Sequence, residues 1–239
     1  QISGVRLVQF KYYIGTVHMN LGTDNSFSES ENIFLSCMEE FPELLHTDPI
    51  LIELRNELAV LYSRQGKLVE AYDLIIEVAE DFANVLGVDS RQYLIVQTSI
   101  AYLKRQFGEF EEAKSILEPV IESMKQVLGE NHQNTIGAEF DYLSLQKDMG
   151  LTDEVAILLF KEKLTMLYGK ESCTKINNLL GLYYLVQERY EEAELIFQEN
   201  VNYSEARNSD IAPMLYMNLA VSLSCQDKDQ SAEQYLQKC

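Results

Sequence analysis

Apolar residues recur along the chain with the spacing of amphipathic helices. Leu54, Leu58 and Leu61 are separated by four and three residues, and apolar residues continue at similar intervals from Leu74 to Phe82. This spacing places the apolar side chains on one face of an α-helix. Only 4 prolines and 11 glycines interrupt the 239 residues. The pattern therefore predicts an all-α protein rather than a loop-rich or disordered chain.

The helical pattern repeats at an interval of about forty residues. Residues 58–71 align with residues 100–113 at an offset of 42, and the pattern recurs weakly around residues 143–155 and clearly at 180–193 and 219–232. A repeat of this length that carries two small residues predicts a hairpin of two helices, A and B. The aligned residues in the first two copies are Ala59 with Ala101, Gly66 with Gly108 and Ala71 with Ala113.

The small residues have a packing role in this interpretation. The first allows helix A to approach its partner and the second does the same from helix B, so a larger side chain there would cost about 1–3 kcal/mol by overpacking. Gly66 and Gly108 are expected to end helix A in the left-handed conformation that glycine adopts easily. New A helices are expected to begin near caps at Asn134–Thr135, Ser172 and Asp210.

The repeats divide the chain into two regions. Residues 1–49 form an irregular first hairpin, with helices expected at Val5 to Leu21 and Phe27 to Phe41 and a linker between them. Residues 50–239 form about five repeats, of which the last is expected to be truncated, as in a piece of a longer protein. The fourth repeat departs from the pattern because Leu143 and Val155 replace the small residues, which should loosen or shift its packing.

These segments resemble tetratricopeptide repeats, and in particular the long repeats of about 42 residues found in kinesin light chains. The resemblance implies a right-handed superhelical α-solenoid of antiparallel helix hairpins, in which the A helices line a concave groove that binds peptides. The residues that carry it are Gln65-Gly66-Lys67 with Glu70-Ala71, Gly108 to Ala113, Arg189 to Ala193, and the loop from Leu128 to Thr135.

The family's groove positions can be carried over to three asparagines of this sequence. An amide both donates and accepts hydrogen bonds, so a row of asparagines can pair with an extended peptide backbone whatever its sequence. The alternative is that these residues are solvated polar positions on the A helices. The three residues are Asn56, Asn178 and Asn218.

Four cations follow the small positions of the second to fourth repeats, toward the end of helix A. Stacked repeats would align them in a basic stripe, and arginine can bind a carboxylate through two hydrogen bonds. The stripe predicts an acidic peptide as the partner. The alternative is that the cations cap helix C-termini, where the helix dipole favours positive charge. The four residues are Arg64, Lys104, Arg105 and Lys147.

The net charge of −19 limits the range of partners. A strongly acidic chain repels nucleic acid and anionic membranes, so neither is an expected partner. No apolar run reaches the roughly 18 residues that a membrane-spanning helix needs, so membrane insertion is not expected. The repeat alignment assigns most acids to helix B and its turns, including the Glu111–Glu112 and Glu191–Glu192 pairs at helix starts.

Catalysis and metal binding have no support in the sequence. Phosphate-binding loops and hydrolase or metalloprotease motifs are missing, and the three histidines are scattered. The four cysteines have neither CxxC spacing nor a neighbouring histidine that would complete a zinc site. We expect reduced thiols, no cofactor and no metal, which is typical of a cytoplasmic protein. The cysteines are Cys37, Cys173, Cys225 and Cys239.

The functional prediction is an adaptor or scaffold module that binds a protein or peptide segment in the groove of its A helices. The alternative is a peptide-sensing regulatory domain, such as that of a bacterial transcription regulator. A third possibility is an assembly domain attached to an enzyme. Self-association is compatible with each of the three.

Overall fold

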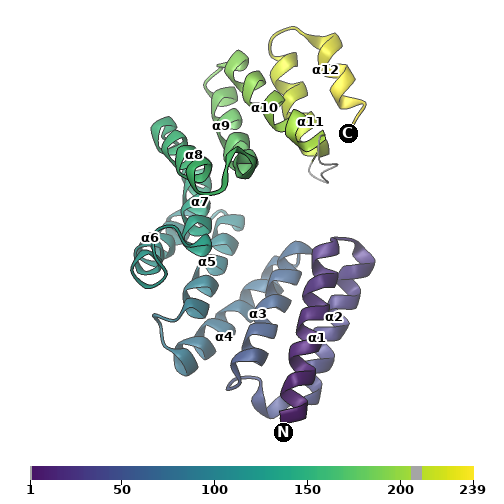
Figure 1. Ribbon diagram of the computed structural model, residues 1–239, viewed down its shortest axis with the longest axis vertical. Coiled ribbons are helices and arrows are strands. Elements are labelled where there is room, and N and C mark those ends of the chain that lie inside the picture. Colours follow the sequence, from purple (N-terminus) through teal and green to yellow (C-terminus); the bar gives the residue numbers. More distant parts are fainter. Residues whose placement is uncertain (1, 206–211) are drawn as a thin grey trace. The chain divides into compact units, whose positions relative to one another are not determined.

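The computed structural model describes residues 2–205 and 212–239 (Figure 1). Within these residues the chain contains α-helices and two short 3₁₀-helices, η1 and η2, and no strand, so the all-α prediction is confirmed. The elements are α1 (Ile2–Leu21), α2 (Asp24–Glu40), η1 (Pro42–Leu44), α3 (Pro49–Arg64), α4 (Leu68–Leu86), α5 (Arg91–Gln106), α6 (Phe110–Val127), α7 (Gln133–Asp148), α8 (Glu154–Tyr168), η2 (Lys170–Cys173), α9 (Thr174–Val186), α10 (Tyr190–Glu205), α11 (Ala212–Ser224) and α12 (Asp229–Leu236).

The chain forms two compact units, Gln1–Leu145 and Gln146–Cys239. The first contains the hairpins α1–α2, α3–α4 and α5–α6 and most of α7, and the second contains the end of α7 and α8 to α12. Within each unit the two helices of a hairpin run antiparallel and pack side by side, as α3 and α4 do in the first unit and α9 and α10 in the second (Figure 1). The boundary falls inside α7, in the hairpin whose small residues the sequence replaces. The expected α-solenoid class is confirmed by the stacked hairpins of each unit.

Each A helix is followed by a left-handed residue seven positions after its small position, which Leu143 occupies in α7. Gly66 and Gly108 have φ of 77° and 79°, as expected. The backbone N–H of Lys67 donates to the carbonyl oxygen of Tyr62 at 2.9 Å, which closes the terminal turn. Glu188 and Asp227 occupy the same position in α9–α10 and α11–α12 with φ of 58° and 59°, although only glycine adopts this conformation without steric cost.

The small residues pack as predicted. A Cβ atom added to Gly15 would lie 2.3 Å from the Phe34 ring, and one added to Gly181 would lie 2.5 Å from the Phe197 ring. Both phenylalanines are fully buried. The helices therefore approach closely only because these positions lack a side chain. The equivalent residues of the B helices are almost completely buried: Ser30, Ala71, Ala113, Ala193 and Ala232.

The predicted small position of helix B in the fourth repeat is wrong by two residues. Val155 is 62% exposed, whereas in α4, α6, α10 and α12 the small residue is the fourth residue of the helix and is buried. In α8 that position belongs to Ile157, which is fully buried. The turn from Gly150 to Asp153 is longer than in the other repeats, and Asp153 caps α8 by accepting a hydrogen bond from the Val155 backbone.

Several predicted helix ends also differ. The second helix begins at Asp24 rather than Phe27 because Thr23 and Ser26 form a reciprocal cap. Asn134 and Thr135 lie inside α7, and the His132 ring nitrogen accepts a hydrogen bond from the Asn134 backbone instead. Ser172 belongs to η2 rather than capping a helix. The expected cap at Asp210 lies outside the described residues.

Neighbouring hairpins of the first unit share their apolar cores. Leu51, Leu54, Leu58 and Leu61 of α3 pack against residues of α1 and α2, including Phe34. The corresponding face of α5 packs against α4, and that of α7 contributes Ala138 to a cluster with α5 and α6. α3 and α5 are thus each held between their own B helix and the preceding hairpin. This arrangement leaves a further face of α3, α5 and α7 available to line a common surface.

Candidate functional site

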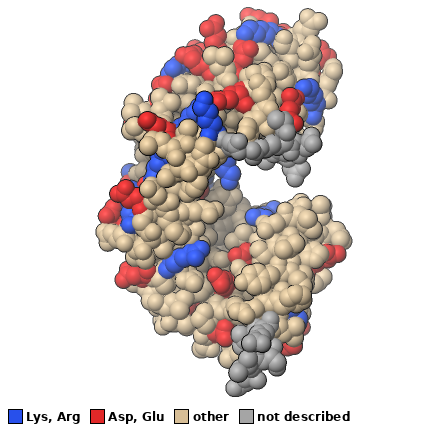
Figure 2. All heavy atoms as spheres, viewed as in Figure 1, with Lys and Arg blue, Asp and Glu red and all other residues tan. Residues whose placement is uncertain are grey.

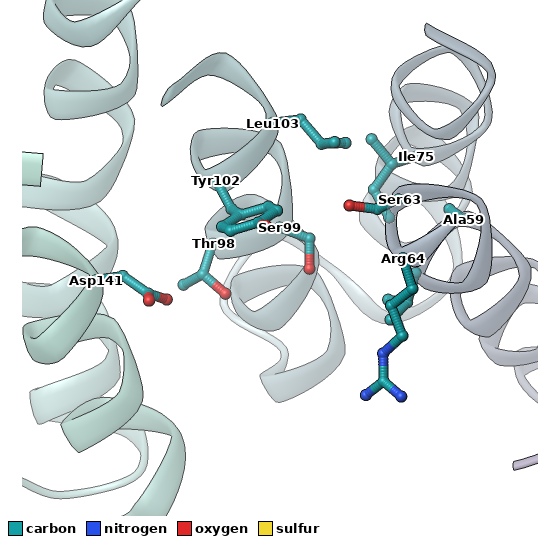
Figure 3. A pocket seen from close by; sticks show the side chains of 10 residues that line it. Ala59, Ser63, Arg64, Ile75, Thr98, Ser99, Tyr102, Leu103 and Asp141 are labelled. Carbon is teal, nitrogen blue, oxygen red and sulfur yellow. The ribbon is translucent and has the colours of Figure 1, made fainter. Parts of the chain in front are cut away.

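A cavity of about 280 Å³ lies on the A helices of the first unit (Figure 3). α3, α5 and α7 supply all but one of its lining residues, and α4 supplies the other, Ile75. We call it the α3–α5–α7 cavity. It lies on the helices that the resemblance to tetratricopeptide repeats assigns to a groove. The lining residues are Ala59, Val60, Ser63, Arg64, Ile75, Thr98, Ser99, Tyr102, Leu103 and Asp141.

The cavity combines an aromatic surface with hydroxyl groups. Tyr102 is 41% exposed, although it is a large amphipathic residue in the middle of a helix. Thr98 and Ser99 lie one turn earlier on the same face of α5, and both hydroxyls donate to the Ile95 carbonyl oxygen. Asp141 and Arg64 lie on opposite sides of these residues (Figure 3). The lining therefore presents apolar, polar and charged contacts within one small area.

Arg64 is held in place by the first hairpin. Its Nη1 donates to the Met19 carbonyl oxygen near the end of α1 at 3.2 Å. This contact uses one of the five N–H donors that a guanidinium carries. Arg64 is therefore positioned at the cavity and retains donors for a further acceptor.

Two carboxylates lie on α3 before Arg64, one turn apart. Burial raises the pKa of Glu57, and the charge of Glu53 raises it further, while Arg64 and a hydrogen bond from Tyr12 act in the opposite direction. Burial also raises the pKa of Glu53, against the lowering effect of Arg91. This part of α3 thus carries mixed charge rather than the uniformly basic surface that the sequence suggested.

Of the four cations in the predicted basic stripe, only Arg64 lines the cavity. The Lys104 Nζ lies 2.6 Å from Glu109 Oε2 and 2.7 Å from Glu112 Oε2, and 5.0 Å from the centre of the Tyr72 ring. Arg105 is half-buried and is not among the lining residues. Lys147 belongs to the second unit and pairs with Asp148 at 3.0 Å. A short turn joins α5 to α6, so the acids at the start of α6 lie close enough to form ion pairs with Lys104.

The three predicted asparagines have different environments. Asn56 is 8% exposed, and its amide oxygen has no hydrogen-bond partner among the described residues. It is therefore more deeply buried than a groove residue was expected to be. In the second unit, Asn218 Nδ2 donates to Asn178 Oδ1 at 2.6 Å. These two residues of neighbouring A helices lie side by side, as stacking of repeats requires.

The first unit contains a buried charge network that was not predicted from the sequence. Arg55 is 2% exposed, and its guanidinium binds Asp81, the Glu77 carboxylate at 2.7 Å and the Leu45 carbonyl oxygen. His46 Nδ1 lies 2.7 Å from Asp81 Oδ2. The spacing of Glu77 and Asp81, one turn apart on α4, was the available signal. This network fixes the loop before α3 to α4, and none of its residues lines the cavity.

The described residues form neither a metal site nor a disulfide. No group of His, Cys, Asp or Glu side chains there is arranged to hold a metal ion. The four cysteines are free thiols, of which Cys37 and Cys173 are buried. None of the helices in the described part of the chain is long and apolar enough to cross a membrane.

Comparison with known proteins supports the repeat assignment. Residues 51–126, which span most of α3 to α6, match the family model described as tetratricopeptide repeat. This segment contains every lining residue of the α3–α5–α7 cavity except Asp141. No curated protein matches the sequence.

Several solved structures share the fold at low sequence identity. BtubC (BKLC) from P. vanneervenii matches with a TM-score of 0.69 and 16% identity over 89% of each chain. A putative kinesin light chain from Podospora anserina with nearly identical repeats matches with a TM-score of 0.59 and 18% identity over 78% of this chain and 92% of that one. A tetratricopeptide repeat protein from Parabacteroides merdae matches with a TM-score of 0.59 and 17% identity, covering 100% of this chain and 79% of that one.

At these identities the structures establish the fold alone, and the family model establishes the repeats of the second and third hairpins. The resemblance inferred from the sequence is confirmed: residues 51–126 match tetratricopeptide repeats, and the chain has the fold of tetratricopeptide repeat proteins, among them kinesin light chain-like repeat proteins.

Proposed function

We propose that the chain is a protein-interaction scaffold that binds an extended peptide segment in the α3–α5–α7 cavity. The observation that carries the proposal is that A helices from three successive hairpins supply this lining, with Tyr102 exposed among hydroxyl groups. Concave sites that combine apolar surface with a few convergent polar groups are typical of ligand binding. We infer that the chain acts as an adaptor rather than an enzyme, because stacked repeats provide an extended surface for binding a segment.

The size and chemistry of the cavity favour a peptide. A volume of about 280 Å³ accommodates a few side chains of a segment that continues along the A helices. Tyr102 offers a rigid aromatic surface for an apolar side chain. The hydroxyl groups of Ser63, Thr98 and Ser99 can accept hydrogen bonds from peptide backbone N–H groups.

Arg64 supports a preference for an acidic side chain near one end of the bound segment. Its guanidinium is already oriented by the Met19 carbonyl oxygen, so little side-chain freedom is lost when it binds a carboxylate. Charge-assisted bonds of this kind are stronger than neutral ones. The charge of Lys104 is compensated by Glu109 and Glu112. We therefore assign the acidic preference to Arg64 rather than to a row of cations.

Selection of a random phage-displayed peptide library on the full chain tests the proposal. The enriched peptides should contain an acidic and an apolar residue. Their affinity should fall at least tenfold on Tyr102→Ala and on Arg64→Gln, and only the carboxylate contact should weaken with added salt. Tyr168→Ala, which removes an exposed tyrosine of α8, is the matched control and should bind the peptides as the unaltered chain does.

Two outcomes would contradict the proposal. Enriched peptides that bind Tyr102→Ala with unchanged affinity would place the binding surface elsewhere. A failure to enrich any sequence, in a selection that succeeds on a known peptide-binding protein in parallel, would exclude autonomous peptide recognition by the chain.

A further inference from the structure

The two ends of the α3–α5–α7 cavity differ in charge. Among the described residues that line it, Arg64 and Asp141 are the two with charged side chains. Arg64 belongs to α3 and Asp141 to α7, and the lining side chains of α5 lie between them (Figure 3). The cavity therefore has a basic end at α3 and an acidic end at α7.

The residues at the acidic end present acceptors of hydrogen bonds. Thr98 Oγ1 donates its proton to the Ile95 carbonyl oxygen at 2.7 Å, and Ser99 Oγ donates to the same oxygen at 3.4 Å. A hydroxyl group that has used its proton in this way can only accept. An ionised carboxylate also only accepts, so this end of the cavity suits a group that carries several N–H donors.

Asp141 can accept from a ligand in addition to its contact within the chain. Its side chain is half-buried and lies beside Thr98, on the far side of the cavity from Arg64 (Figure 3). It takes part in another interaction within the chain. A carboxylate has about four acceptor positions on its two oxygens, so this interaction and a bond from a ligand are compatible.

Tyr102 provides an apolar surface next to these acceptors. It is 41% exposed and follows Thr98 by one turn of α5. Arginine and lysine combine an apolar stem with a charged head group. The stem can lie along the tyrosine ring while the head group reaches Asp141. Of the two, arginine fits better, because its planar group can donate to the carboxylate and to the Thr98 hydroxyl together.

The charge of the whole chain also favours a basic residue in the bound segment. The chain contains 38 acidic and 19 basic residues and has a net charge of −19, and Figure 2 shows acidic side chains spread over the surface in view. A segment with acidic residues alone is repelled by this field, whereas a positive charge is attracted. An arginine therefore offsets the repulsion of the acidic residue that binds Arg64.

We propose that Thr98, Tyr102 and Asp141 form a subsite for an arginine side chain of the same segment whose acidic residue binds Arg64. This inference rests on the proposed peptide site and adds to the chemistry of its partner. The arginine stem lies on the Tyr102 ring, and its guanidinium donates to Asp141 and Thr98. Because the two ends of the cavity have opposite charges, the segment binds in one direction, with its acidic residue and its arginine in a fixed order.

Peptides selected from the random library on the full, unaltered chain are the probes for the test. We expect them to share an arginine at a fixed distance from the acidic residue and always on the same side of it. Replacing this arginine with citrulline removes its charge and keeps its shape. Fluorescence anisotropy should show about tenfold weaker binding of the citrulline peptide. Equal binding of the citrulline and arginine peptides to the unaltered chain would overturn the proposal.

Asp141→Asn shows whether the arginine binds at this end of the cavity. The variant should bind the arginine peptide about tenfold more weakly and should no longer distinguish it from the citrulline peptide, because both changes remove one interaction. Glu122→Gln neutralises an exposed acid of α6 and is the matched control, which should distinguish the two peptides as the unaltered chain does. Circular dichroism establishes that both variants are folded.

The outcomes separate this inference from the proposed function. A preference for arginine over citrulline that persists in folded Asp141→Asn would place the arginine elsewhere and overturn the inference. Peptides that depend on Tyr102 and Arg64 but share no arginine would overturn the inference alone and leave the proposed peptide site intact. A selection that enriches no peptide would overturn both.

Discussion

At the scale of the residue, glycines inside helices have different roles in different hairpins. Gly15 and Gly181 are glycines because a phenylalanine ring of the partner helix occupies the space of a Cβ atom. Gly137 lies in the middle of α7 and has no atom within 4 Å of an added Cβ. The sequence alone does not distinguish these three helical glycines from one another. Only the structure separates the two that packing requires from the one that it does not.

Alanine substitution at two of these glycines should therefore have opposite effects. Gly181→Ala should destabilise the chain by about 1–3 kcal/mol, because the buried Phe197 ring has to move. Gly137→Ala should stabilise it by up to about 1 kcal/mol, because alanine favours the helix and meets no neighbour. Denaturant unfolding followed by circular dichroism measures both. Equal effects of the two substitutions would show that α9 and α10 are not in close contact at Gly181.

The left-handed turns offer a second test at this scale. Glu188 and Asp227 hold positive φ where the earlier repeats have glycine. Replacing each with glycine should stabilise the chain by about 1 kcal/mol, because the steric cost of the left-handed conformation disappears. The thermal midpoint should rise for Glu188→Gly and for Asp227→Gly, and should fall for Gly66→Ala as the reverse control. A lower midpoint for both glycine variants would contradict the turn geometry.

At the scale of the element, the sequence predicted helices and their pairing better than the register and the direction of side chains. The small residues and the turn glycines repeat at fixed intervals, so the hairpins could be counted. The longer turn before α8 could not be recognised from small residues, and Ile157 occupies a position that was assigned to Val155. Lys104 was expected in the groove, but its direction depends on acids in the following helix.

The network around Arg55 is an element-scale device that joins α3 to α4. Arg55→Met leaves the Asp81 carboxylate, whose side chain is 15% exposed, without its buried partner. The free energy of unfolding should fall by about 3 kcal/mol. The control is Lys114→Met, which removes an exposed ion pair with Glu118 within α6 and should cost less than about 1 kcal/mol. Denaturant titration measures both, and similar losses would show that the Arg55 network is not buried in solution.

Glu57 of α3 makes the stability of the chain depend on pH. Its pKa in the folded chain is raised above the ordinary glutamate value of 4.5, mainly by burial. Its protonated form therefore contributes stability below that value, and this contribution is lost as pH rises through the folded pKa. Glu57→Gln should raise the thermal midpoint at neutral pH and leave it unchanged in acid. The exposed Glu80→Gln is the control, and a gain for Glu57→Gln that is independent of pH would refute the burial of Glu57.

At the scale of the whole molecule, the proposed peptide site is the α3–α5–α7 cavity of the first unit. The resemblance to tetratricopeptide repeats predicted a site on the A helices, and Arg64 was named from the sequence alone. Tyr102 was not predicted to be a site residue, because a tyrosine on the apolar stripe of a helix is expected to pack in the core. Its exposure depends on the spacing between hairpins, which the sequence does not reveal.

The proposed peptide site can be tested most directly by photo-crosslinking from a defined position. A photoreactive phenylalanine analogue replaces Tyr102 in one version of the full chain and Val69, an exposed residue of α4, in another. A peptide selected on the unaltered chain is then irradiated with each version, and the products are sequenced by mass spectrometry. We expect crosslinks from position 102, lost when excess unlabelled peptide competes, and none from position 69. Crosslinking from position 69 alone would contradict it.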